Sequence, residues 1–129
     1  MRGEELGGNY LKTILIVDDQ PGIRMLLEEV FSKEGFETLS ASNGREALDI
    51  FEQLRPELVL LDMKIPGMDG IEILKRMKQE CEGVQVVMMT AYGELNLIEE
   101  AKTWGAVRHF TKPFDVFELR ETVKKLLED

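Results

Sequence analysis

Residues 58–70 read LVLLDMKIPGMDG, and this stretch decides the fold. Its first four residues are continuously apolar, which is typical of a strand covered on both faces of a parallel sheet. The residues that follow carry an apolar stripe at helical spacing, formed by Ile71, Ile73, Leu74 and Met77. The stretch therefore predicts one βα unit, with Asp62 at the carboxyl end of its strand.

The same alternation of apolar run and helical pattern recurs outward in both directions. The apolar runs cover residues 14–17, 36–41, 58–61, 84–89 and 107–110. We interpret all but the weaker second run as strands covered on both faces, and we place the second at an edge of the sheet. Parallel strands joined by helical crossovers form an open sheet with helices on both faces. The pattern therefore predicts an α/β domain with a doubly wound sheet.

The predicted helices have recognisable ends. Asn43 can cap the second helix, and Arg55 and Pro56 would stop it. Gly35 would end the first helix. The apolar stripe of that first helix consists of Ile23, Leu26, Leu27, Val30 and Phe31.

The composition describes one acidic domain. The chain has 129 residues, a length typical of a single domain, and its formal net charge is −9. We therefore expect no nucleic-acid partner and no membrane partner. Binding to either would need a basic patch, and that patch would work against the negative electrostatic field of the whole molecule. The single cysteine, Cys81, fits a reducing cytoplasm, and no apolar run reaches the ~20 residues of a membrane span. We interpret residues 1–10 as a flexible N-terminal extension and residues 11–129 as the domain.

Residues able to handle phosphate or a metal follow four of the predicted strands. Asp18 and Asp19 follow the first, Asp62 the third and Thr90 the fourth, and the fifth runs into Lys112. In open parallel sheets, ligands bind beyond the carboxyl ends of the strands. An isolated pair of aspartates is usually an ordinary turn or helix cap, but the joint arrangement at four strand ends predicts a functional site.

The three carboxylates of this cluster need a compensating cation, because like charges held close together repel one another. Oxygen ligands in a small set favour Mg²⁺ over Ca²⁺. Lys112 adds a point charge that can pair with a carboxylate or a phosphoryl oxygen, and Thr90 adds a hydroxyl donor. Together with an aspartate nucleophile, these groups predict a phosphoryl-transfer site.

Five short motifs lie at these strand ends. They are IVDD at residues 16–19, LLDM at 60–63, PGMDG at 66–70, MTA at 89–91 and KPF at 112–114. Over residues 12–128 the chain resembles the receiver domain of bacterial two-component response regulators. The resemblance implies a flavodoxin-like (βα)₅ fold with five parallel strands in the order 2-1-3-4-5.

The resemblance also implies an acceptor and a metal site. Asp62 matches the aspartate that accepts the phosphoryl group. Asp18 and Asp19 match the acidic pair that binds Mg²⁺, with Asp19 a direct ligand and Asp18 acting mainly through water. Asp62 and the backbone carbonyl of Lys64 would complete the protein ligands.

The remaining site residues are implied in the same way. Thr90 matches the hydroxyl that moves toward the phosphoryl group, and Lys112 matches the cation that binds it, with a cis bond expected between Lys112 and Pro113. His109 stands at the switch position of the fifth strand, where the family commonly has Tyr or Phe. No second His or Cys stands near it to suggest zinc. The candidate partner contacts around the site are Gln20, Ile23, Tyr92, Pro113 and Phe114.

The implied function is that of a phosphoryl carrier rather than a metabolic enzyme. A sensor histidine kinase would supply the phosphoryl group to Asp62, and a histidine phosphotransferase would receive it. Within the family, the chain is similar to stand-alone receivers that act in sporulation relays. We also expect an aspartyl-phosphate phosphatase as a partner, and a monomer. The sequence ends at Asp129, just past the last predicted helix, so we expect the signal to leave through protein contacts or with the phosphoryl group.

Three alternatives remain beside the relay. A binding switch of the chemotaxis kind would use phosphorylation to change its affinity for a partner, and it would differ from a relay in the lifetime of the phosphorylated form. A hydrolase of the haloacid-dehalogenase type needs a second acid two residues after its nucleophile, where this chain has Lys64. A flavodoxin-like electron carrier fits the fold, but the acidic cluster would repel a flavin phosphate.

Overall fold

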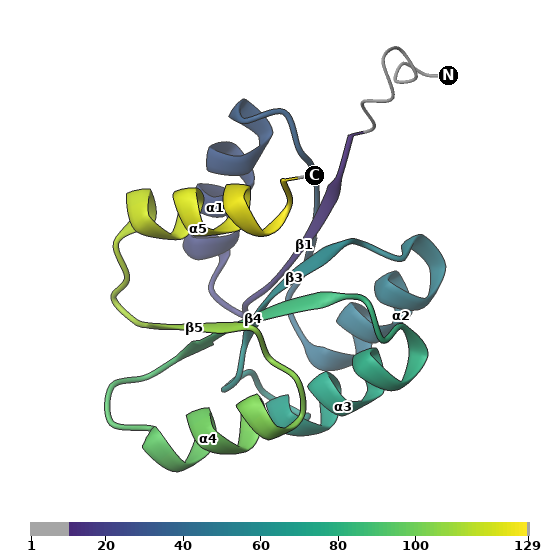
Figure 1. Cartoon of the computed structure of the whole chain (residues 1–129), viewed down its shortest axis with the longest axis vertical. Coiled ribbons are helices and arrows are strands. Elements are labelled where there is room, and N and C mark those ends of the chain that lie inside the picture. Colours follow the sequence, from purple (N-terminus) through teal and green to yellow (C-terminus); the bar gives the residue numbers. More distant parts are fainter. Residues whose placement is uncertain (1–10, 129) are drawn as a thin grey trace.

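The computed structural model describes residues 11–128, and within them strands and helices alternate along the chain (Figure 1). The strands are β1 (Thr13–Val17), β2 (Glu37–Ala41), β3 (Leu58–Asp62), β4 (Gln85–Thr90) and β5 (Arg108–Thr111). The helices are α1 (Pro21–Lys33), α2 (Gly44–Leu54), α3 (Gly70–Glu80), α4 (Leu95–Thr103) and α5 (Val116–Leu126). The extension predicted at residues 1–10 lies outside the described residues.

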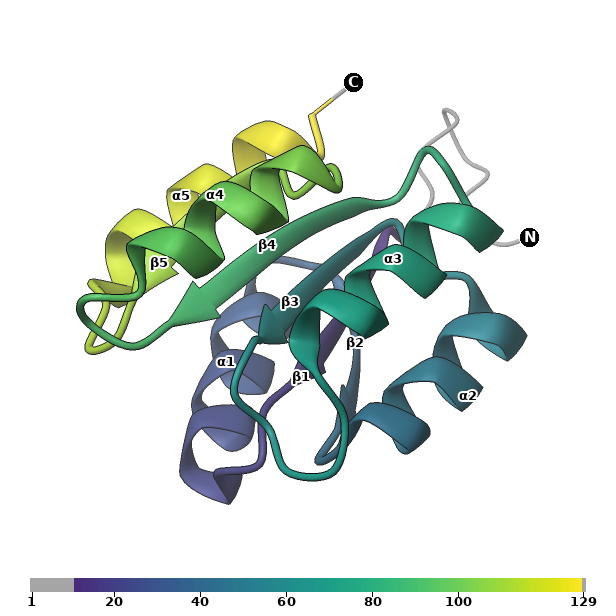
Figure 2. The same cartoon turned by 90° about the horizontal axis from the view of Figure 1, so that it is seen from below.

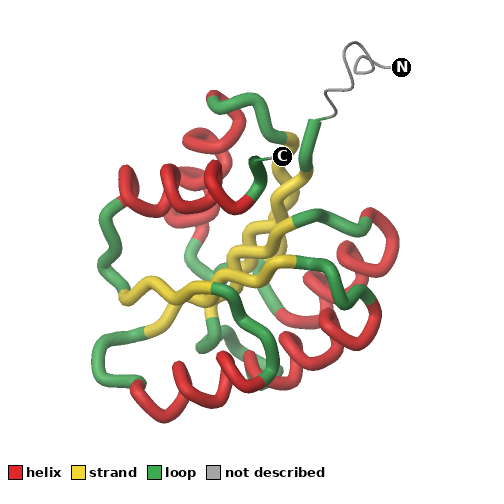
Figure 3. Tube along the Cα trace, viewed as in Figure 1, coloured by secondary structure: helices red, strands yellow, loops and turns green. Residues whose placement is uncertain are grey.

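The strands form one parallel sheet in the order β2-β1-β3-β4-β5, which confirms the predicted doubly wound α/β fold. The sheet lies in the middle of the molecule and the helices lie outside it (Figure 3). Neighbouring strands such as β3 and β4 run in the same direction (Figure 2). Because every strand is parallel, all the carboxyl ends meet at one edge of the sheet, which positions the site.

Two apolar layers cover the two faces of the sheet. Successive strand residues point to opposite faces, so Leu15 and Val17 face α2, α3 and α4, whereas Ile14 and Ile16 face α1 and α5. Figure 1 shows these two groups of helices on opposite sides of the strands. No helix among residues 11–128 is long and apolar enough to cross a membrane.

The predicted helix ends are confirmed. The Asn43 side chain accepts a hydrogen bond from the N–H of Glu46 and so caps α2. Arg55 follows that helix in the left-handed conformation, with φ of 48°. Gly35 follows α1 with φ of 94°, a conformation that glycine adopts without steric cost.

Two predictions of burial were wrong. The run at residues 107–110 was expected to be covered on both faces, but β5 is an edge strand on which Arg108 and His109 are exposed. Leu26 was assigned to the apolar stripe of α1 and is 42% exposed. The buried residues of that helix are Leu27 and Phe31, which turn toward the sheet and leave Leu26 at the margin of the contact.

Candidate functional site

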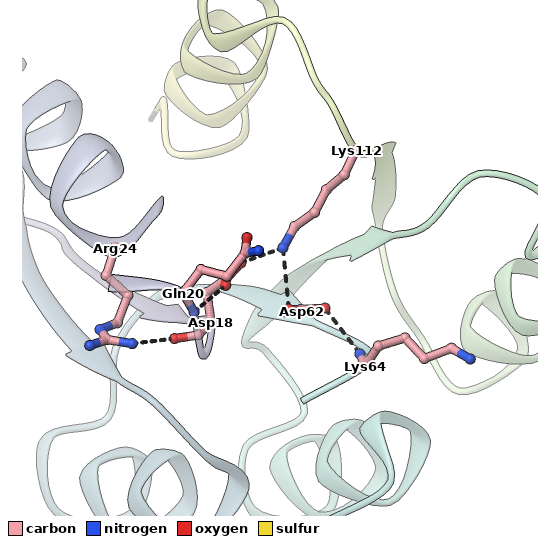
Figure 4. Close-up of polar contacts among 6 residues, drawn as sticks. All are labelled: Asp18, Gln20, Arg24, Asp62, Lys64 and Lys112. Atoms are coloured by element: carbon pink, nitrogen blue, oxygen red, sulfur yellow. Dashed lines mark hydrogen bonds and ion pairs between the residues drawn. The ribbon is translucent and has the colours of Figure 1, made fainter. Parts of the chain in front are cut away.

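The carboxyl edge of the sheet brings together side chains from four strands, and Figure 4 shows three of them, Asp18, Asp62 and Lys112. Asp18 directly follows β1, Asp62 and Thr90 end β3 and β4, and Lys112 directly follows β5. Asp18, Asp62 and Thr90 are buried, although charged residues are seldom fully buried unless they are paired. The sequence prediction that these residues share one place is therefore correct.

Asp18 is held by the turn that leads into α1. Its Oδ1 atom accepts a hydrogen bond from the backbone N–H of Gln20 at 2.9 Å. Its backbone carbonyl accepts a hydrogen bond from Arg24 Nη1 at 2.7 Å. The Asp18 side chain has no exposed surface, so its second oxygen, Oδ2, is directed into the cluster rather than into solvent.

Asp62 is positioned by the loop that follows it. Its Oδ1 atom accepts a hydrogen bond from the N–H of Lys64 at 3.0 Å, and the N–H of Met63 donates to the carbonyl of Met89 at 3.0 Å. Gly70 then starts α3 so close to Met63 that an added Cβ would lie 2.7 Å from its backbone. This close approach is possible only without a side chain, and it sets the path of the loop behind Asp62.

Lys112 pairs with two of the carboxylates. Its Nζ atom lies 2.7 Å from Asp18 Oδ2 and 3.2 Å from Asp62 Oδ2. Burial by itself lowers the pKa of Lys112, but its hydrogen bonds to Asp18 and Asp62 and their charges outweigh burial and raise that pKa above 10.5. Lys112 is therefore a permanent cation at neutral pH. Separately, the peptide bond between Lys112 and Pro113 is cis, as expected.

Thr90 offers an unused hydrogen-bonding group. Among the described residues, its Oγ1 atom is the buried side-chain oxygen or nitrogen that has no hydrogen-bond partner. A buried hydroxyl without a partner costs free energy, about 1–3 kcal/mol, and such a group is often kept for a ligand. A ligand that presents oxygen acceptors at this edge would satisfy it.

Asp18, Asp19 and Asp62 each offer a carboxylate oxygen, and these three oxygens lie within 4.8 Å of one another. Asp19 is exposed, so the cluster is open to solvent on its side. Hard oxygen donors in a small, solvent-accessible set fit Mg²⁺, which keeps several waters when it binds to proteins. The donor set therefore fits the predicted ion.

The predicted partner contacts are not all equally accessible. Gln20, Pro113 and Tyr92 are exposed, and Tyr92 retains 90% of its surface. Ile23 and Phe114 are half-buried and pack against the core layer under α1 and α5, so they also contribute to the fold.

His109 pairs with Met88 across the sheet and is exposed. It lines a hollow of about 320 Å³ beside α4, together with Lys102 and Arg108.

Two residues near the site make contacts that the sequence did not predict. The Arg24 side chain anchors the Asp18 carbonyl. Glu94, which precedes α4, forms an ion pair with Lys64 at 3.3 Å. Nothing in the sequence around Glu94 indicates this pair, because the two residues come from different loops.

A family model described as the response regulator receiver domain matches residues 14–124. "Sporulation initiation phosphotransferase F" of Bacillus subtilis is 66% identical over 114 residues, which cover 88% of this chain and 92% of that protein. "Chemotaxis protein CheY" of the same organism is 36% identical over 88% of this chain and 96% of that protein. The solved structure of a CheY-like receiver domain protein from Methanospirillum hungatei has a TM-score of 0.88 and 32% identity, and covers 92% of this chain and 94% of its own.

Proposed function

This chain belongs to the response regulator receiver domain family, and on that premise we propose that it accepts a phosphoryl group from a phosphohistidine onto Asp62. One observation carries the proposal. Among residues 11–128, a buried carboxylate at the carboxyl edge of the sheet is contacted by one cation, Lys112, near a buried hydroxyl that has no partner, Thr90. These are the groups that a transferred phosphoryl group needs around it.

The reaction exchanges one bond to phosphorus for another. A carboxylate oxygen of Asp62 attacks the phosphorus in line, the new O–P bond forms, and the P–N bond to the histidine breaks. The imidazole leaves with the bond's electron pair and takes up a proton. The product is an acyl phosphate, which can transfer its phosphoryl group to a second histidine by the same chemistry. The protein contributes mainly position and charge.

The residues around Asp62 have separate roles in this step. Lys112 Nζ binds a phosphoryl oxygen and offsets its charge, and the Thr90 hydroxyl donates to another oxygen. Asp19, Asp62 and the backbone carbonyl of Lys64 would hold Mg²⁺, with Asp18 acting through water. When bound, this ion would supply positive charge that reduces repulsion between the acceptor and the incoming phosphoryl oxygens.

We further propose that the chain is a relay intermediate in sporulation. The support is its 66% identity to a protein named as a sporulation initiation phosphotransferase. A sensor histidine kinase would be the donor and a histidine phosphotransferase the acceptor, with an aspartyl-phosphate phosphatase as a third partner. We propose that the protein acts as a monomer in the cytoplasm, where its free Cys81 would stay reduced.

A phosphorylation-dependent binding switch is the second candidate. The observation in its favour is 36% identity to a chemotaxis protein over nearly the same residues. That identity is well below the 66% found with the sporulation protein, so the relay is the better-supported function.

Time-resolved intact mass spectrometry tests the proposal. The protein is mixed with Mg²⁺ and a small acyl-phosphate donor, or with a phosphohistidine donor protein, and Asp62→Asn is the control. We expect the wild type to gain one phosphoryl group and the variant to gain none while keeping its circular dichroism spectrum. A slow decay supports a relay, and decay within seconds supports a switch. Uptake by Asp62→Asn, or no uptake from either donor, would contradict the assignment.

A further inference from the structure

An ion pair at the rim of the site joins two loops. Lys64 Nζ lies 3.3 Å from Glu94 Oε2. Lys64 belongs to the loop that follows β3, and Glu94 directly precedes α4. Residues of both segments line a hollow of about 390 Å³ beside the pair. The pair therefore links the loop of the acceptor to the start of α4.

Lys64 contacts the acceptor with its backbone only. Its N–H donates to Asp62 Oδ1, whereas its side chain extends away from Asp62 (Figure 4). That side chain is 57% exposed, so it is not locked by packing. A lysine side chain is flexible along its four-carbon stem, and its ammonium can change partners without a movement of the backbone.

Glu94 occupies the N-cap position of α4 without capping it. The N-cap residues of α2, α3 and α5 accept hydrogen bonds from helix N–H groups, but the side chain of Glu94 accepts none. Its carboxylate is paired with Lys64 instead. A carboxylate at a helix N-terminus is stabilised by the helix dipole. Glu94 can therefore lose Lys64 at little cost.

Phosphorylation would change the charge beside Lys64. A phosphoryl group gives Asp62 about two negative charges in place of one, next to Asp18 and Asp19, while Lys112 is already shared between Asp18 and Asp62. Given the proposed function of Asp62, we propose that Lys64 then exchanges Glu94 for the phosphoryl group. Glu94 is thus a competitor for Lys64, and it limits how tightly and how long the site holds a phosphoryl group.

Beryllofluoride with Mg²⁺ provides a test that needs no hydrolysis, because it mimics a phosphoryl group on an aspartate. Its affinity is measured calorimetrically for the wild type and for Glu94→Gln. We expect the variant to bind about two- to fivefold more tightly, the scale of an exposed ion pair. The half-life of the phosphorylated form should lengthen by a similar factor. In a Lys64→Met background, Glu94→Gln should change neither value.

Glu99→Gln is the matched control. Glu99 lies on the same helix and pairs with Lys102 at 3.7 Å, so the variant removes the same charge and a comparable ion pair. The inference is overturned if Glu94→Gln behaves like Glu99→Gln, if it weakens beryllofluoride binding, or if its effect persists without Lys64. If the wild type binds no beryllofluoride and gains no phosphoryl mass, the proposed function fails as well. Binding by the wild type with no response to Glu94→Gln overturns this inference alone.

Discussion

The two edges of the sheet use polar residues in different ways. At the amino edge, Glu57 Oε1 accepts a hydrogen bond from the N–H of Thr13 at 2.7 Å. Gln85 Nε2 donates to the carbonyl of Leu126 at 2.7 Å. These contacts satisfy backbone groups where a strand begins and where α5 ends, so the polar residues there stabilise the chain.

At the carboxyl edge the polar groups are not balanced among themselves. Asp18 and Asp62 share the ammonium of Lys112, and the hydroxyl of Thr90 has no partner in the part of the chain that the structure describes. Groups that remain incompletely paired lower stability, but they are ready to bind a ligand. The comparison indicates that one edge serves the fold and the other serves the reaction. Substitutions at either edge test this division.

The largest effect is expected for Asp19→Asn. Removal of one carboxylate of the proposed ligand set should weaken Mg²⁺ affinity by at least about tenfold, since even changes outside the ligand shell cost about 10–100-fold. The measurement is a calorimetric Mg²⁺ titration, with urea unfolding to show that stability is retained. An unchanged titration would remove Asp19 from the proposed ligand set.

Lys64→Asn should shorten the lifetime of the phosphorylated form by several-fold. Once the Lys64 side chain has turned from Glu94 to the phosphoryl group, as proposed above, it would obstruct water that could attack the acyl phosphate. Asparagine is shorter and uncharged, so it would leave that water unobstructed. The lifetime is measured by intact mass spectrometry, as the rate at which the added phosphoryl mass is lost after the donor is removed. Equal half-lives in the two proteins would show that Lys64 does not protect the phosphoryl group.

Gln85→Ala tests the amino edge. The loss of its hydrogen bond to Leu126 should lower the free energy of unfolding by about 1 kcal/mol, while phosphoryl uptake by Asp62 stays unchanged. The free energy of unfolding, from urea denaturation, and phosphoryl uptake, from intact mass, are measured on the same samples of the variant and the wild type. Gln79→Ala, at an exposed position on α3, is the control. A loss of uptake without a loss of stability would mean that the two edges are not separate.

The smallest effect concerns an ion pair between the last turn of α5 and the end of α1. A hydrogen bond from Lys124 lowers the pKa of Glu34 below 4.5, and this outweighs the opposing effect of burial. A lowered pKa contributes stability above pH 4.5 that is lost as the pH falls through the pKa of the folded state. Lys124→Met should therefore be less stable than the wild type at pH 7, and the difference should shrink in acid.

The control for this pair is Lys125→Met, in the same turn of α5. Urea unfolding at pH 7 and at values below 4.5 measures the difference. A difference that did not shrink in acid would show that Glu34 is not the partner through which Lys124 stabilises the fold.

Local patterns were sufficient to predict most elements of the fold. The first four residues of β3 are apolar because both faces of that buried strand are covered, and residues such as Asn43 and Gly35 mark helix ends through backbone chemistry. The exposure of Arg108 on β5 was missed because the run at residues 107–110 was treated as apolar, although Arg108 and His109 interrupt it and the expected strand order places this strand at an edge.

The convergence of the site was predicted from the parallel direction of the strands, because parallel strands bring their carboxyl ends to one edge. The contacts between side chains within the site were not predicted. Which carboxylates Lys112 contacts depends on the register between β4 and β5, and the anchoring of Asp18 by Arg24 depends on the path of a turn.

The sequence by itself determined the chemistry that is available: three carboxylates, a hydroxyl and a lysine at the ends of strands. Residue type and spacing are local properties, and they carry that information directly. Only the tertiary structure decided that Thr90 lacks a partner within residues 11–128 and that Lys64 is paired with Glu94. These relations join segments that are distant in the chain, and they exist because packing of the helices on the sheet brings the segments together.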